Sequence, residues 1–370
     1  MKIVISGGGT GGHIYPALTI AAQLQKVNPK AEITFVGTKA GLEKDIVPRY
    51  GYPLEYISVA GFERKFSLQT ICSAGKLLVG MVQAFNLLRR LKPDLVIGTG
   101  GYVCGPILFW AAMRGVPACI QEQNAMPGVT NKILARFVDK IFLGYKEGAR
   151  YFPGEAKKDY TGNPVRSEVM SCSKEKGWET FGLDPAKVTI LAFGGSRGAR
   201  TINAAMAQME TNMAGRTDVQ ILHATGSLDY EKYMAALDER VKTAENIKIL
   251  PYIHAMPAAL AVADLAVSRA GAIGLAELMV KGVPSILIPY PYATANHQEF
   301  NARALENVGA AKVILNKDLT GVKLQETIEN LLLHKDEMTA MHQAAVKAGM
   351  PQAAADIAAK ALELVEKKGK

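Results

Sequence analysis

The chain has 370 residues, of which 49% are hydrophobic and 21% are charged, so it is long enough for two globular domains with substantial cores. Its cysteines (Cys72, Cys104, Cys119 and Cys172) form no CxxC pair and lie in apolar surroundings, which disfavours a disulfide framework or a cysteine metal site. We see no signal peptide, and the two most apolar stretches, 71–88 and 103–120, are interrupted by basic residues, proline or glycine, which is not typical of a spanning helix.

The net charge of +9 is unevenly distributed along the chain. Residues 1–162 hold 20 Lys and Arg against 11 Asp and Glu, a balance of +9, whereas residues 163–370 hold 23 against 23. Such an asymmetry indicates that the first half faces an anionic partner, either nucleic acid or an acidic membrane surface. The alternative is a solvated basic surface with no partner.

Short apolar runs alternate with helical patterns along the whole chain. We expect strands over 2–6, 32–36, 94–97, 118–121 and 140–143, and then over 187–193, 219–223, 247–250, 264–267 and 285–288. Continuous apolar strands separated by helices indicate parallel sheets that are covered on both faces. The predicted fold class is therefore α/β.

A strand that runs into a glycine-rich loop and then a helix occurs twice, at 2–13 and at 187–200. This echo predicts two doubly wound domains in tandem, with the cleft between them as the active site. The Gly-Asn-Pro segment within 159–168 reads as the boundary loop. We expect domains over 1–162 and 163–350, followed by a helix over 351–370 that packs back on the first domain.

The first glycine loop spans Gly7 to Gly12 and is followed by His13. Glycines let the backbone approach a phosphate or a sugar, and the helix that follows offers free N–H groups. The spacing satisfies GxGxxG, but no acid stands where a dinucleotide site holds its ribose, since the nearest, Glu43, comes after the second strand. A nicotinamide enzyme is therefore disfavoured. His13 is a candidate general base, and a capping or packing histidine is an equal alternative.

Three later segments carry polar groups beside predicted strand ends. The loop 194–200 reads GGSRGAR and offers a hydroxyl, amides and guanidiniums at a helix start, which suits a diphosphate. The segment 268–277 places Glu277 where a carboxylate can accept hydrogen bonds from both hydroxyls of a ribose. The cluster 296–301 contains Gln298, whose amide suits sugar hydroxyls because it donates and accepts.

No two Asp residues in the chain are separated by a single residue, so the Asp-x-Asp metal clamp of one large glycosyltransferase class is missing. Helix dipoles and Arg side chains should therefore carry the charge of a leaving diphosphate. We predict no cofactor bound by the protein, and nothing in the sequence requires a divalent metal.

Residues 62–92 form a long helical pattern that is apolar around most of its circumference and basic at its fringes. The pattern predicts that Leu78, Val82 and Leu88 pack on the sheet. It leaves a basic-rimmed apolar edge suited to a membrane surface, made of Leu77, Met81, Leu87, Arg89 and Arg90. A wholly buried helix is the alternative, and the charge excess of this half favours the membrane.

Taken together, these motifs resemble the MurG family of bacterial glycosyltransferases. The resemblance covers nearly the whole chain and keeps the order of the motifs, which are GGGTGGHIYPALTIA (7–21), GTGGYVCGP (98–106), QEQNAMPG (121–128), TGNPVR (161–166), FGGSRGAR (193–200), SRAGA (268–272) with Glu277, and HQEFNA (297–302).

The resemblance implies a GT-B fold, two Rossmann-like doubly wound domains facing across a cleft, and inverting transfer of N-acetylglucosamine from UDP-N-acetylglucosamine. The acceptor would be the C4 hydroxyl of N-acetylmuramyl-pentapeptide on polyprenyl diphosphate. The first domain would bind the acceptor at the cytoplasmic face of the membrane as a peripheral protein, and the second would bind the UDP-sugar. His13 resembles the proposed base. The donor contacts carried over by the resemblance are Thr10, Gly11, Gly12, Asn124, Arg166, Ser196, Ile253, Ala272, Glu277 and Gln298. Two departures from some members are Gly274 in place of Thr and His297 in place of Gln.

Two rival functions remain at this point. A UDP-sugar 2-epimerase of similar fold would need no lipid acceptor, and the basic-rimmed apolar helix argues against it. A nucleic-acid-binding protein would need exposed aromatic residues among its basic ones, and only 7% of the residues are aromatic.

Overall fold

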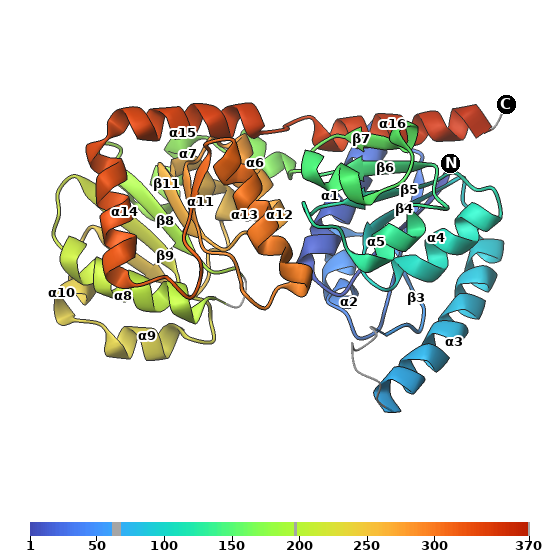
Figure 1. Cartoon of the computed structure of the whole chain (residues 1–370), viewed down its shortest axis with the longest axis horizontal. Coiled ribbons are helices and arrows are strands. Elements are labelled where there is room, and N and C mark those ends of the chain that lie inside the picture. The colour runs from blue at the N-terminus through green and yellow to red at the C-terminus, as the bar shows by residue number, and fades with distance from the viewer. Residues whose placement is uncertain (61–67, 196–197, 369–370) are drawn as a thin grey trace. The chain divides into compact units, whose positions relative to one another are not determined.

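The computed structural model describes residues 1–60, 68–195 and 198–368 (Figure 1). The chain divides into two compact units. Unit 1 comprises Met1–Pro164 together with Gln352–Lys370, and unit 2 comprises Val165–Pro351. Each unit contains one parallel sheet with helices on its faces, so the predicted α/β class is confirmed.

Unit 1 is built on a seven-stranded sheet of order β3-β2-β1-β4-β5-β6-β7, in which every neighbouring pair is parallel. Its strands are β1 (Lys2–Gly7), β2 (Glu32–Gly37), β3 (Leu54–Tyr56), β4 (Leu95–Gly100), β5 (Ala118–Glu122), β6 (Lys140–Leu143) and β7 (Lys158–Tyr160). The order reverses between β1 and β4, because the chain winds outward first on one side of β1 and then on the other.

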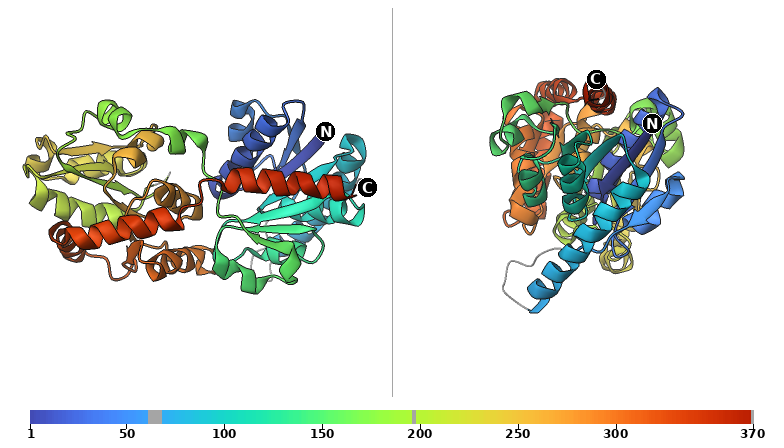
Figure 2. Two further views of the ribbon diagram at one scale, coloured as in Figure 1. Left: turned by 90° about the horizontal axis from the view of Figure 1, so that it is seen from above. Right: turned by 90° about the vertical axis from the view of Figure 1, so that its right-hand side faces the viewer.

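Helices cover both faces of this sheet. They are α1 (Gly11–Val27), α2 (Glu43–Ile46), α3 (Leu68–Leu91), α4 (Cys104–Met113), α5 (Val129–Leu134) and α16 (Ala353–Lys368). Strand residues alternate between the faces, so Ile3 and Ile5 join one core with α1 and α16 while Val4 joins the other with α3 and α4. The last helix, α16, lies along unit 1 and contacts α1 (Figure 2).

Unit 2 is built on a six-stranded parallel sheet of order β10-β9-β8-β11-β12-β13. Its strands are β8 (Val188–Phe193), β9 (Val219–Ala224), β10 (Ile247–Leu250), β11 (Leu265–Ser268), β12 (Ser285–Leu287) and β13 (Ala311–Val313). The order again reverses next to the first strand, between β8 and β11.

The helices of unit 2 are mostly short. They are α6 (Ser167–Ser171), α7 (Lys174–Phe181), α8 (Arg200–Met213), α9 (Tyr230–Ala236), α10 (Glu239–Lys242), α11 (Met256–Val262), α12 (Ala272–Val280), α13 (His297–Asn307), α14 (Gly321–Leu333) and α15 (Lys335–Ala348). Buried methionines and leucines of α8 and α14 pack on the inner strands and form one core. This core holds α8 against the sheet directly behind the second glycine loop.

Each strand segment expected from the sequence overlaps an observed strand, and three further strands, β3, β7 and β13, were missed. All three have three residues and lie at an edge of their sheet. Their sequences, LEY, KDY and AKV, carry charged residues and lack the apolar run that marks a central strand. Edge strands form because a neighbour offers hydrogen bonds, which short sequence patterns do not report.

The face that α3 turns to the sheet differs from the prediction. Leu87 is only 7% exposed and packs in the core, so its assignment to an exposed membrane edge is wrong. Leu78 and Val82, which were expected to pack on the sheet, are 70% and 62% exposed. The helix is apolar around most of its surface, so periodicity could not choose the buried face. The rest of the 62–92 segment, up to residue 67, lies outside the described residues.

Candidate active site

Predicted site residues follow strands at the two points where strand order reverses. In unit 1 the loop after β1 holds Thr10 and leads into α1, which begins with Gly11, Gly12 and His13, and in unit 2 the loops after β8 and β11 lead into α8 and α12. In doubly wound sheets, ligands bind at the carboxyl ends of the strands at this reversal. The topology therefore gathers the predicted residues of each unit at the expected edge of its sheet.

The loops after β1 and β4 in unit 1 are joined to each other. The Gly8 N–H donates to the Gly100 carbonyl at 3.3 Å, and the Thr99 hydroxyl donates to the His13 carbonyl at 2.8 Å. A side chain at Gly101 would lie 2.5 Å from the Gly8 oxygen, so the close approach requires glycine there. Thr10 is the N-cap of α1, yet its side chain makes no cap hydrogen bond. The first turn of α1 is thus not capped by its own threonine.

His13 lies on the first turn of α1 and is half-buried. Its Nδ1 is 2.9 Å from the Gly8 carbonyl oxygen. A carbonyl only accepts, so Nδ1 carries the proton, and in the neutral ring Nε2 is left as the acceptor. Gly100 makes room for the ring, because a Cβ there would lie 3.0 Å from Nε2. The histidine is therefore oriented by the backbone and has the tautomer that a general base needs.

Asn124 is held by a buried carboxylate in the loop after β5. Glu122 Oε1 accepts from the Asn124 backbone N–H at 2.9 Å and from its side-chain amide at 3.2 Å. Glu122 Oε2 accepts from the Gly128 N–H at 3.1 Å and from the Asn131 amide at 2.9 Å. Glu122 belongs to the QEQNAMPG motif, but the sequence suggested no role for it. The structure shows that its carboxylate holds the loop after β5 in place.

The second glycine loop of the chain belongs to unit 2 and leads from β8 into α8. Ser196, together with Arg197, lies outside the described residues, so its predicted phosphate contact stays a prediction. A Cβ at Gly198 would lie 2.1 Å from the Thr225 carbonyl oxygen, so this loop is pressed against the end of β9. Ala199 is the N-cap residue of α8, and no side-chain hydrogen bond caps this helix start.

Behind this loop lies a buried polar network that the sequence analysis did not identify. The Asn203 amide donates to the Thr225 carbonyl at 2.9 Å, and its Oδ1 is 3.3 Å from His223 Nε2. His223 Nδ1 is 2.8 Å from Glu210 Oε1, and the Tyr233 hydroxyl donates to Glu210 Oε2 at 2.7 Å. Burial and the Glu210 charge raise the pKa of Tyr233, so its hydroxyl remains a donor. The network connects α8, β9 and α9.

Arg166 and Glu277, predicted to bind the phosphates and the ribose, form an ion pair with each other. Arg166 Nε and Nη2 lie 2.9 and 2.8 Å from Glu277 Oε1. Burial raises the pKa of Glu277, and the neighbouring Arg166 opposes this shift. The pair places a guanidinium and a carboxylate beside the first turns of α12.

Gln298 is oriented by two backbone amides. Its Oε1 accepts from the Ala270 N–H at 3.2 Å and from the Tyr290 N–H at 2.9 Å. Because both neighbours donate, the oxygen must face them and the side-chain NH₂ group must point the other way. Ala272 begins α12 directly after this loop, and Gly271 caps the helix with no side-chain hydrogen bond. The arrangement offers amide donors next to an uncapped helix start.

Ile253 follows β10, and only 2% of its surface is exposed. Its side chain is therefore part of the core. Its predicted place beside the uracil stays a prediction.

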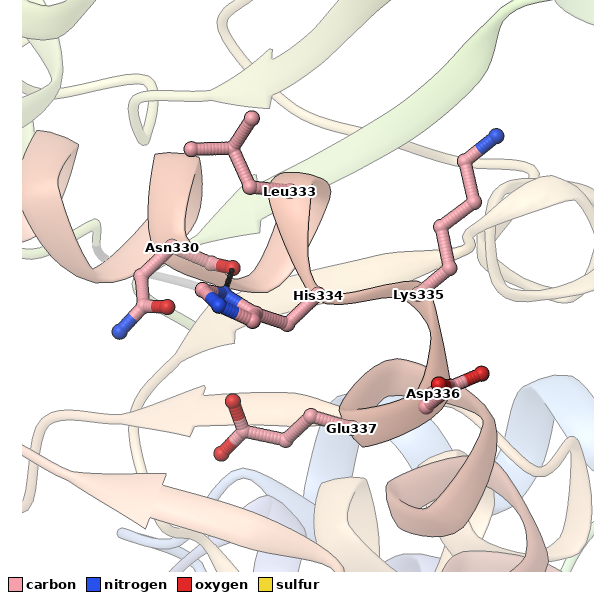
Figure 3. A pocket seen from close by; sticks show the side chains of 6 residues that line it. All are labelled: Asn330, Leu333, His334, Lys335, Asp336 and Glu337. Atoms are coloured by element: carbon pink, nitrogen blue, oxygen red, sulfur yellow. Dashed lines mark hydrogen bonds between the residues drawn. The ribbon is translucent and has the colours of Figure 1, made fainter.

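A hollow elsewhere in unit 2 holds none of the predicted residues (Figure 3). It lies where α14 meets α15 and is lined by Asn330, Leu333, His334, Lys335, Asp336 and Glu337. His334 Nδ1 donates to the Asn330 carbonyl at 2.8 Å, which closes the end of α14. Within the described residues, no group of three or more His, Cys, Asp or Glu side chains is arranged to hold a metal ion.

Comparison with known proteins agrees with this geometry. Residues 3–143 match the glycosyltransferase family 28 N-terminal domain, and residues 189–357 match the glycosyltransferase family 28 C-terminal domain. A protein of Desulforamulus reducens is 48% identical over 360 residues, covering 96% of this chain and 97% of its own length. It is described as UDP-N-acetylglucosamine–N-acetylmuramyl-(pentapeptide) pyrophosphoryl-undecaprenol N-acetylglucosamine transferase.

The chain belongs to the MurG family.

Solved structures agree with membership of the MurG family. The crystal structure of Acinetobacter baumannii MurG matches with a TM-score of 0.79 and 27% identity, over 98% of this chain and 99% of that one. The fold is accordingly of the GT-B type, as the resemblance implied. A UDP-GlcNAc 2-epimerase from Neisseria meningitidis also matches, with a TM-score of 0.69 over 98% and 99% of the two chains. At 14% identity, this second likeness concerns the fold alone.

Proposed function

We propose that this chain transfers N-acetylglucosamine from UDP-N-acetylglucosamine to the C4 hydroxyl of N-acetylmuramyl-pentapeptide on polyprenyl diphosphate, the step from lipid I to lipid II in peptidoglycan synthesis. The observation that carries the proposal is the 48% identity to a transferase of this name over 96% of the chain. The residues at the strand-order reversals supply the groups that such a reaction needs.

Unit 2 would hold the donor. Glu277 would accept hydrogen bonds from the ribose hydroxyls, the NH₂ group of Gln298 would donate to the N-acetylglucosamine, and Ile253 would lie beside the uracil. The diphosphate would lie against Arg166, the Ser196 loop and the starts of α8 and α12. Support comes from the uncapped starts of α8 and α12, whose dipoles favour negative charge. These groups would stabilise the leaving diphosphate without a metal ion bound by the protein.

Unit 1 would hold the acceptor diphosphate at its glycine loops and activate the sugar hydroxyl. The C4 oxygen would attack C1 of the donor sugar from the face opposite UDP, and His13 Nε2 would take its proton. Support comes from the Nδ1 hydrogen bond to Gly8, which leaves Nε2 as the acceptor in the neutral ring. Thr10, Gly11, Gly12 and Asn124 would contact the donor from this unit.

The decisive assay incubates the protein with UDP-N-acetylglucosamine and a short-chain lipid-linked muramyl-pentapeptide. We expect UDP release that depends on the acceptor, and a product with inverted anomeric configuration. Retention of configuration would contradict a single displacement. Formation of UDP-N-acetylmannosamine without any acceptor would instead identify a 2-epimerase.

We also propose that the protein works as a peripheral protein at the cytoplasmic face of the membrane. Within the described part of the chain, no helix is both long enough and apolar enough to cross a bilayer. The surface that supports peripheral binding is an α3 patch, defined as Leu78, Val79 and Val82, which are 70%, 51% and 62% exposed. Val82 is three positions from Val79 and four from Leu78, so it neighbours both on the helix surface. Exposed basic residues stand on the same helix, among them Lys76, Arg89 and Arg90.

Vesicle co-sedimentation tests the membrane proposal. Binding to vesicles with anionic lipid should exceed binding to neutral ones and weaken with salt. The double substitution Leu78→Ser with Val82→Ser should reduce binding. Val322→Ser on α14 of unit 2 removes an apolar side chain of a residue that is 52% exposed and should leave binding unchanged. Equal binding by both variants would remove the α3 patch from the proposal.

A further inference from the structure

A fully buried carboxylate touches the glycine loop of unit 1. Glu43, the first residue of α2, has no exposed surface. Its Oε2 accepts from the Gly9 N–H at 2.9 Å. Its Oε1 accepts from the Thr38 N–H at 2.7 Å and from the Thr38 hydroxyl at 2.8 Å. One side chain therefore ties the loop after β1 to the loop after β2.

Three glycines make room for this one carboxylate. A Cβ at Gly8 would lie 2.6 Å from Oε1 of Glu43, and a Cβ at Gly41 would lie 2.0 Å from its Oε2. A Cβ at Gly37 would lie 2.4 Å from its Cγ. Real Cβ atoms do not approach other atoms so closely, so the chain leaves out three side chains around the acid. The space is shaped for Glu43 in this position.

His13 binds the opposite end of the same peptide group. The Gly9 N–H that donates to Glu43 and the Gly8 carbonyl that accepts from His13 Nδ1 belong to one peptide bond. Hydrogen bonds that share a peptide polarise one another, because charge drawn toward the oxygen strengthens both the N–H donor and the C=O acceptor. A negative charge at the N–H end thus makes the carbonyl a better partner for the Nδ1 proton.

We propose that Glu43 is a positioning residue for His13 and acts through the Gly8–Gly9 peptide. The carboxylate fixes the peptide plane, the peptide oxygen holds Nδ1–H, and Nε2 is kept ready to accept a proton. When Nε2 takes the proton of the acceptor hydroxyl, the imidazolium is stabilised by the polarised carbonyl, and Glu43 itself keeps its charge. The logic is that of a carboxylate that orients a catalytic histidine, with a peptide group inserted between them. The inference rests on the proposed role of His13 as the base.

Glu43→Gln tests the relay without changing the size of the side chain. Both carboxylate oxygens accept from backbone N–H groups, whereas glutamine has one oxygen and must turn its NH₂ toward Gly9 or Thr38. We expect kcat to fall about tenfold or more, within the range of general-base catalysis, while the donor KM changes less than about threefold. Glu32→Gln, which makes the same charge change at an exposed position on β2, should leave both constants unchanged.

A double-mutant cycle separates positioning from simple structural support. If Glu43 acts through His13, Glu43→Gln should cause no further loss of kcat in a His13→Ala background. An equal loss in both backgrounds would overturn the relay. Near-full activity of His13→Ala alone would instead refute the proposed base, so the two failures are distinguishable.

Nitrogen NMR of the His13 ring gives a readout that needs no substrate. We expect the Nδ1–H tautomer in the parent protein, and a smaller share of that tautomer in Glu43→Gln. Cys104 is a titratable neighbour of Glu43, but burial raises its pKa to about 11, so it is neutral when the spectra are recorded near neutral pH. The same share of the Nδ1–H tautomer in both proteins would overturn the relay.

Thr38→Val is the fallback if Glu43→Gln does not fold. It removes the hydroxyl bond to Oε1 and the acceptor of the Gly41 N–H at 3.2 Å, and it keeps the Glu43 charge and the Gly9 contact. We expect a smaller loss of kcat, which again disappears in the His13→Ala background. A loss that persists there would count against the relay.

Discussion

The glycine loops after β1 and β8 occupy equivalent places in their sheets but are secured in different ways. In unit 1 the carboxylate of Glu43 bonds the loop backbone directly, at Gly9. In unit 2 the buried carboxylate of Glu210 is separated from the loop by His223, Asn203 and Thr225. A buried carboxylate therefore supports each loop. Glu43 contacts its loop directly, and Glu210 acts through intervening residues.

The difference matches the work proposed for each loop. A catalytic histidine must keep one ring orientation and one tautomer, so its supporting peptide benefits from a charged partner in contact. A diphosphate is bound by several amides and a helix dipole, which act together and tolerate small shifts. The comparison predicts that unit 2 substitutions change donor affinity and stability, whereas Glu43 in unit 1 changes turnover.

The largest effect is expected for Glu277→Ala. The donor KM should rise about 10- to 100-fold, because hydrogen bonds to a charged group contribute roughly 1.5–3 kcal/mol. The acceptor KM should change less than about threefold. Steady-state kinetics with each substrate varied in turn measures both constants, and Glu326→Ala on the exposed face of α14 is the matched control. An unchanged donor KM would remove Glu277 from the donor site.

The next effect concerns the network behind the second loop. His223→Phe should lower the free energy of unfolding by about 2–4 kcal/mol, because the Glu210 carboxylate loses a hydrogen-bond partner while it remains buried. Urea unfolding and UDP affinity should both respond, since Asn203 joins the network to the end of β9. The exposed His334→Phe provides the comparison. Equal stability of the two variants would show that the network does not support the loop.

A pair of glycines isolates the contact between the second loop and Thr225. Gly198 and Gly215 both have positive φ, +76° and +79°, but only a Cβ at Gly198 meets a neighbouring atom within 4 Å. Gly215→Ala should cost about 1 kcal/mol for its backbone conformation. Gly198→Ala should cost roughly 1–3 kcal/mol more and weaken UDP binding. Thermal unfolding and UDP titration measure the difference, and equal costs would contradict close packing of this loop.

The smallest effect is a pH dependence of donor binding. Burial raises the pKa of Glu277, so on acidification its carboxylate is protonated at a higher pH than an ordinary glutamate. Protonation removes the acceptor and the Arg166 ion pair, so the donor KM should rise as pH falls, by about twofold where pH equals the pKa. Kinetics between about pH 8 and pH 5 tests this. Glu277→Gln cannot ionise and should show no such rise; an identical rise in both proteins would assign it to another group.

Much of the fold could be predicted from the sequence, because its signals are local. Apolar runs such as KIVIS and KVTILAF, each followed by glycines, indicate buried parallel strands that end in tight loops. The glycine loops also located the strand ends at which the proposed site residues gather. The edge strands and the buried face of α3 could not be predicted from local sequence patterns. The strands β3, β7 and β13 depend on a neighbouring strand, and α3 is apolar on several sides.

The partners of the polar groups were decided by the tertiary structure alone. Arg166 meets Glu277 across 111 positions, and Gly9 meets Glu43 across 34. From its position in the sequence, Glu43 was only an acid in the wrong place for a ribose. Folding buries it among three glycines, and burial makes its hydrogen bonds obligatory, because a charge removed from water must be paired. The sequence alone gives the residue types and their local patterns, whereas the pairing of distant residues depends on how the strands are arranged in the sheet.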